Sequence, residues 1–99
     1  MKIYNIFDKL VFSKDREIEE TIFENDQVKI IRISSLNQVT DFYDQDQLEI
    51  VKIEEGRARL EIEGETLELK EGDILPIKPH QVHRVIGQDH TVWLCIFLK

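Results

Sequence analysis

Apolar and polar residues alternate along most of the chain from residue 18 onward. Residues 57–63 read RARLEIE, so the three apolar side chains share one face of a strand and the charged side chains take the other. Gly64-Glu65 then provides a two-residue turn, and residues 66–70 alternate again. The pattern predicts an antiparallel hairpin over residues 57–70 whose apolar face points toward a core.

Shorter apolar segments on both sides of this hairpin predict further strands, over residues 27–35, 48–53, 74–77, 82–86 and 91–98. The last of these segments is apolar on both faces, which indicates burial on both. Eight or so short strands without a long helix are typical of a β-sandwich or barrel. Only Ile3 to Phe12 has apolar residues at helical spacing, so we expect one or two helical turns there, covering an open end of the barrel.

The composition narrows the classes of partner. The chain has 99 residues, enough for one domain, and a formal charge of −7. This acidic balance argues against a nucleic-acid surface and against an anionic membrane surface. The first residues lack the apolar core of a signal peptide, and no apolar stretch approaches the ~20 residues of a membrane span. We therefore expect a cytoplasmic protein, with its one cysteine, Cys95, buried as a free thiol.

Two motifs lie in register over residues 49–83. The first runs from Glu49 across six residues to Gly56, and the second runs from Gly72-Asp73 to His83. Together they resemble the two sequence motifs of the cupin superfamily, and the flanking strands extend the resemblance to about four-fifths of the chain.

The resemblance implies an all-β fold, namely an antiparallel double-stranded β-helix, or jelly-roll-like barrel. It implies one cupin domain over residues 1–99, with a cap over 1–15 that includes the short helical segment and with barrel strands over 18–98. A narrower likeness, which includes residues 42–45 and 80–85, is to small bacterial cupins of largely unknown role. That likeness implies the size and the fold, and it implies no particular reaction.

The resemblance also implies a metal site, from which this chain departs. Cupins usually place His-x-His ahead of the motif glutamate. Counted back from Glu49, those positions are Tyr43 and Gln45, or Phe42 and Asp44 if the spacer is one residue longer. Neither register contains a histidine, so Glu49 and His83 are the two usual ligands that remain. A divalent Fe, Mn, Ni or Zn ion would be held by Glu49 and His83, with Gln45 and His80 as further donors. The alternative is a metal-free buried pair of Glu49 and His83, because a buried carboxylate needs a partner.

In either case we expect one ligand pocket inside the barrel, lined by Tyr43, Gln45, Glu49 and His83. Three functions stay open: binding of a small molecule, metal-dependent catalysis of the dioxygenase or isomerase type with a degenerate ligand set, and a structural dimer that modulates a partner. The missing His-x-His favours small-molecule binding over catalysis. The doubly apolar last strand and the exposed strand edges predict a homodimer.

Overall fold

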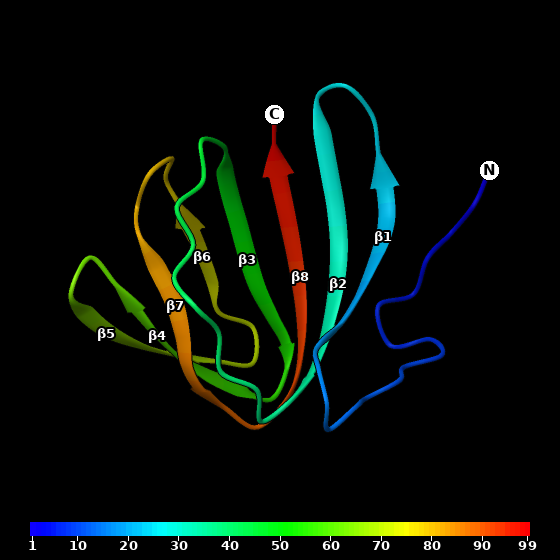
Figure 1. The fold of residues 1–99 in the computed structure, drawn as a ribbon. Helices are drawn as coiled ribbons and strands as arrows, with labels where there is room; N and C mark the ends of the chain where they lie inside the picture. The colour runs from blue at the N-terminus through cyan, green and yellow to red at the C-terminus, as the bar shows by residue number, and fades with distance from the viewer.

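The computed structural model describes residues 1–99 and contains eight strands and no helix. The strands are β1 (Ile18–Glu24), β2 (Val28–Leu36), β3 (Leu48–Glu55), β4 (Arg57–Ile62), β5 (Glu65–Lys70), β6 (Ile74–Ile77), β7 (His83–Gln88) and β8 (His90–Leu98). They form a five-stranded sheet in the order β1-β2-β8-β3-β6 and a three-stranded sheet in the order β5-β4-β7. All pairings are antiparallel. The sheets face each other and splay apart toward the end that carries the C-terminus (Figure 1), as expected for a double-stranded β-helix.

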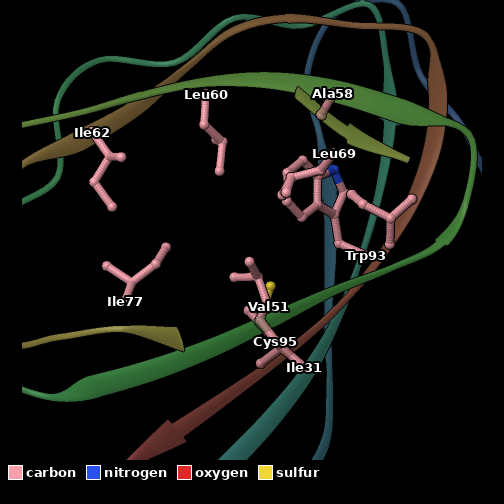
Figure 2. Packing of buried hydrophobic residues seen from close by; sticks show 10 residues of the cluster. Ile31, Val51, Ala58, Leu60, Ile62, Leu69, Ile77, Trp93 and Cys95 are labelled. Atoms are coloured by element: carbon pink, nitrogen blue, oxygen red, sulfur yellow. The ribbon is translucent and has the colours of Figure 1, made fainter. Parts of the chain in front are cut away.

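Apolar side chains fill the space between the two sheets. Leu60 of β4 points toward Val51 of β3, and Ile62 of β4 points toward Ile77 of β6 (Figure 2). Each of these residues is less than a tenth exposed. The alternation in residues 57–63 therefore correctly predicts which side chains face inward. The same buried cluster includes Ile31, Ile53, Ala58, Leu69, Ile77 and Trp93.

The turn between β4 and β5 differs from the prediction by one residue. Ile62 pairs with Glu65, so Glu63 and Gly64 form the turn, with φ angles of 49° and 81°. Positive φ at both central residues is the requirement of the tight type I′ hairpin turn. The connection between β3 and β4 also requires a glycine, the motif residue Gly56. Its φ is 89°, and a Cβ there would clash with the carbonyl oxygen of His90.

The helical segment predicted near the N-terminus is wrong. Residues 3–12 contain one hydrogen-bonded turn, in which the amide of Asp8 donates to the carbonyl of Asn5 at 3.0 Å, and no helix. The reason lies in Arg32, whose buried guanidinium donates to the carbonyl oxygens of Asp8 and Ile6 at 2.6 and 3.1 Å. A helix would use these carbonyls for its own hydrogen bonds. No helix in the structure is long and apolar enough to cross a membrane.

The N-terminal segment lies along the outer side of β1 and β2 (Figure 1). Arg32 also pairs with Glu20 of β1, so this outward-facing cation joins the segment to two strands. Farther along, the ring of Phe12 stacks on the imidazole of His90 with 3.8 Å between centroids. The segment therefore reaches the turn between β7 and β8.

Strand β8 occupies the centre of the five-stranded sheet, between β2 and β3. Thr91 and Trp93 on its inner face are buried, and Cys95 is a buried free thiol as predicted. Burial also raises the pKa of the Cys95 thiol well above its usual value, which suppresses the reactive thiolate. The outer face is different: Ile96 lies in one row with Ile30 and Ile50, and a single chain covers this row only in part.

Candidate functional site

Glu49 and His83 reach the interior from the two opposite sheets. Glu49 is the second residue of β3, and it faces inward because Leu48 and Ile50 take the outer face. His83 is the first residue of β7 in the three-stranded sheet. Both residues are buried, at 7% and 5% exposure, although both are ionisable. Such burial requires specific partners.

The backbone fixes Tyr43 beside His83. The amide of Tyr43 donates to the carbonyl of His83 at 2.7 Å, and the amide of His83 donates back at 3.1 Å. Thr40 adds two more bonds to Val85, so the irregular segment between β2 and β3 runs along the free edge of β7. This pairing explains how a residue outside any named strand reaches the site.

The polar side chains form one connected group. The amide nitrogen of Gln45 donates to Glu49 Oε1 at 2.9 Å, and His83 Nε2 lies 3.6 Å from the same oxygen. His83 Nδ1 lies 2.8 Å from the carbonyl oxygen of Gln81, which can only accept. Nδ1 therefore donates to this carbonyl, and Nε2 faces the carboxylate, which also only accepts, so the protonated ring suits both partners. The ring of Tyr43 is tilted against the imidazole, with 5.6 Å between centroids.

Two opposing effects set the charge of His83. Burial lowers its pKa, but the facing carboxylate of Glu49 and the carbonyl of Gln81 outweigh burial, and the net pKa is raised above its usual value. The positively charged imidazole is thus favoured inside the fold. Glu49 and His83 form a buried ion pair whenever the ring is protonated.

The phenol of Tyr43 responds to the acidic surroundings. Burial raises the pKa of Tyr43, and the charges of Glu17, Glu19 and Glu49 raise it further, while Thr40 acts in the opposite direction. Tyr43 therefore keeps its proton at neutral pH and can donate a hydrogen bond.

These residues line a cavity of about 110 Å³ between the two sheets. All four predicted pocket residues, Tyr43, Gln45, Glu49 and His83, are among its walls. The remaining walls are Glu17, Glu19, Ile31, Ile33, Thr40, Val51, Leu60, Ile77, Val85, Trp93, Cys95 and Phe97.

Sequence reasoning missed Glu17 and Glu19. Glu19 pairs with Ile33 in the β1–β2 register, and Ile33 is itself a wall of the cavity. The sequence around these residues reads E-I-E-E, which is equally typical of a solvated strand edge. Only the register of β1 on β2 shows which glutamates face inward, and no residue pattern within β1 specifies that register.

A hydrogen-bonded chain fixes one wall of the cavity. The indole nitrogen of Trp93 donates to Gln88 Oε1 at 2.9 Å, and the amide nitrogen of Gln88 donates to Glu17 Oε2 at 3.2 Å. The hydroxyl of Ser35 donates to the same glutamate oxygen at 2.5 Å. Trp93 is therefore held in one orientation, and Glu17 has its partners within the fold.

His80 is not part of this cavity. Its Nδ1 lies 2.7 Å from Asp44 Oδ1, and the two side chains are 67% and 59% exposed. His80 has a positive φ of 63°, in the loop before β7. The four candidate metal donors are thus split, with Glu49, His83 and Gln45 in the cavity and His80 outside it.

The donors inside the cavity do not fit a complete transition-metal site. No group of three or more His, Cys, Asp or Glu side chains is arranged to hold a metal ion. Glu49 and His83 supply two donors, whereas catalytic zinc and non-haem iron sites use three protein ligands. Gln45 directs its nitrogen at Glu49, a placement that follows from the hydrogen-bond network. The cavity therefore lacks the ligand set of a catalytic metal centre.

A wider groove of about 440 Å³ lies on the three-stranded sheet beside the turn between β7 and β8. Charged residues such as Arg57, Lys70 and Asp89 line it, and an ion pair of 2.7 Å joins Arg59 to Glu68. None of the candidate site residues lies there, so this groove is separate from the barrel cavity.

A family model described as a cupin domain matches residues 38–97, which include the two motifs, Tyr43 and the last strand. The chain belongs to the cupin family. The match ends one residue before β8 does, and it leaves out the N-terminal segment, β1 and β2. Among the curated proteins, none matches this cupin.

Solved structures agree on the fold. A protein from Ralstonia eutropha JMP134, named provisionally as a mannose-6-phosphate isomerase, is 32% identical, with a TM-score of 0.93 over 100% of this chain and 99% of that one. An RmlC-like cupin from Desulfovibrio desulfuricans is 18% identical, with a TM-score of 0.87 over 99% and 96% of the two chains. A conserved protein of unknown function from Streptococcus pyogenes is also 18% identical, with a TM-score of 0.85 over 99% and 87%. The last two show the fold alone.

Proposed function

We propose that this cupin binds a small molecule in the cavity between its sheets. The observation that carries the proposal is the buried pair of Glu49 and His83, which forms one wall of a cavity otherwise lined mainly by apolar side chains. Ligand sites usually combine an apolar surface with a few convergent polar groups in this way. We also propose that the protein works in the cytoplasm, where a free thiol such as that of Cys95 stays reduced.

Each polar group has a distinct role in this proposal. Glu49 accepts hydrogen bonds from the ligand, and Gln45 holds the carboxylate in place through its amide nitrogen. His83 balances the charge of Glu49. Tyr43, which is 46% exposed, lies where the cavity meets solvent and donates from its phenol.

A thermal-shift screen of small molecules tests the proposal, with two histidine variants as a matched pair. His83→Gln should abolish the shift produced by a hit, because it removes the ring that faces Glu49. His80→Gln should leave the shift unchanged, because His80 lies outside the cavity. If a small molecule stabilises His83→Gln to the same degree as the wild-type protein, it binds outside the cavity that His83 lines.

Metal-dependent catalysis of the isomerase or dioxygenase type is the second candidate function. The 32% identical relative, named provisionally as a mannose-6-phosphate isomerase, favours the isomerase. Elemental analysis of protein purified without a His tag separates the two candidates. About one equivalent of Fe, Mn, Ni or Zn, reduced in both Glu49→Gln and His83→Ala, would support catalysis over simple binding.

A further inference from the structure

The charged groups of the cavity are almost all of one sign. Its sixteen wall residues include three carboxylates, those of Glu17, Glu19 and Glu49. They include one imidazole, that of His83, and no lysine or arginine. Even with His83 protonated, the walls carry an excess of negative charge. A cavity with such walls repels anions and attracts cations.

The three carboxylates differ in whether they already have partners. Glu17 accepts hydrogen bonds from Ser35 and Gln88, and Glu49 is held by Gln45 and His83. Glu19 is exposed and takes part in no ion pair or side-chain hydrogen bond. It is therefore the carboxylate that is free to pair with a ligand.

The uncharged walls also suit a cation. The aromatic rings of Tyr43, Trp93 and Phe97 line the same space, and the face of an aromatic ring attracts an ammonium group. The cavity volume of about 110 Å³ is smaller than the ~150 Å³ of an apolar cavity that holds benzene. It can enclose the head of a ligand, and the rest of the ligand would extend past Tyr43 into solvent.

We propose that the cavity selects the ammonium head of a small organic amine, with Glu19 as the residue that determines this specificity. The proposal rests on the proposed function, because it names the class of ligand for the same cavity. An amine-selective cavity would not bind a phosphorylated sugar. A phosphate group would need a lysine or arginine nearby, and the walls provide neither.

Three probes with one carbon skeleton test this choice: isopentylammonium, isopentanol and isovalerate. They differ in a cationic, neutral or anionic head, and calorimetric titration at neutral pH and low salt gives their affinities. Trp93 is the one tryptophan of the chain and a wall of the cavity, so a change in its fluorescence locates the binding. We expect the amine to bind at least about tenfold more tightly than the alcohol, and isovalerate and mannose-6-phosphate not to bind.

Glu19→Gln should weaken amine binding about two- to fivefold and leave binding of the alcohol unchanged, as expected for the loss of one partly exposed ion pair. Glu65→Gln is the matched control. It removes the same charge at an exposed position of β5 that is not a cavity wall, and it should leave amine binding unchanged. Equal losses in the two variants would indicate a general effect of net charge and would overturn the role of Glu19.

The outcomes separate the two proposals. If the alcohol binds at Trp93 as tightly as the amine, or isovalerate binds more tightly, the ligand class is wrong and the binding cavity stands. If no probe binds, the ligand class is also wrong, and the thermal-shift screen with His83→Gln decides the binding function independently.

Discussion

At the scale of single residues, the interior of the fold holds an ionisable pair, Glu49 and His83. Glu49 and His83 are almost fully buried, and each compensates for the cost of burying the other. Glu49 has a second partner in Gln45, whose amide nitrogen donates to the carboxylate. This hydrogen bond gives the buried carboxylate a neutral partner in addition to the imidazole of His83.

The raised pKa of His83 predicts how stability depends on pH. A group whose pKa is higher in the folded protein stabilises the fold fully below its unfolded pKa, ~6.5 for histidine, and loses this contribution as pH rises through the folded pKa. The stability advantage of the wild-type protein over His83→Gln should therefore be larger near pH ~6 than near pH ~9.

Urea unfolding of the two proteins at both pH values measures this difference. His80→Gln is the control, because His80 is exposed and pairs only with Asp44. It should retain the pH dependence of the wild-type protein. A difference between wild type and His83→Gln that grows with pH would contradict the assigned direction.

At the scale of strands, the sequence predicts the elements better than it predicts the site. Residues 57–70 specify their own hairpin, because alternation and turn lie within one short segment. Glu49 and His83 are found because each belongs to a motif that carries its own spacing. Glu17 and Glu19 are missed because their orientation depends on a partner strand. The N-terminal helix is predicted wrongly because a distant residue, Arg32, takes the carbonyls that a helix needs.

The hairpin provides a direct stability prediction. Leu60 is 2% exposed in the central cluster, and Leu60→Ala should cost about 2–5 kcal/mol, since it deletes buried methyl groups and leaves a cavity. Arg59 is its neighbour on the opposite face, where it pairs with Glu68 while both side chains remain largely exposed. Arg59→Ala should change the free energy of unfolding by no more than about 0.5 kcal/mol. Equal shifts of the urea midpoint would show that the two faces of β4 are assigned wrongly.

At the scale of the whole molecule, the outer face of the five-stranded sheet carries a row of apolar side chains that a single chain covers only in part. Ile30, Ile96 and Ile50 form a row across three neighbouring strands on the outer face, and each remains partly exposed. A continuous surface of this kind is typical of an interface between protein chains.

We therefore predict a homodimer in which the outer faces of two five-stranded sheets pack together around a two-fold axis. Sedimentation at ~10 µM protein, where a stable dimer stays assembled, should give about twice the 11.8 kDa mass of the chain. Ile96→Glu places a charge at the centre of the row and should give a monomer, because an unpaired charge in an apolar interface costs more than the contacts return. Thr66→Glu, at an exposed position of β5, adds the same charge away from this face and should remain dimeric. If the wild-type protein sediments as a monomer, the predicted dimer is wrong. If Ile96→Glu is still a dimer, the protein is dimeric but its interface lies elsewhere, for example at the free edges of β1 and β6.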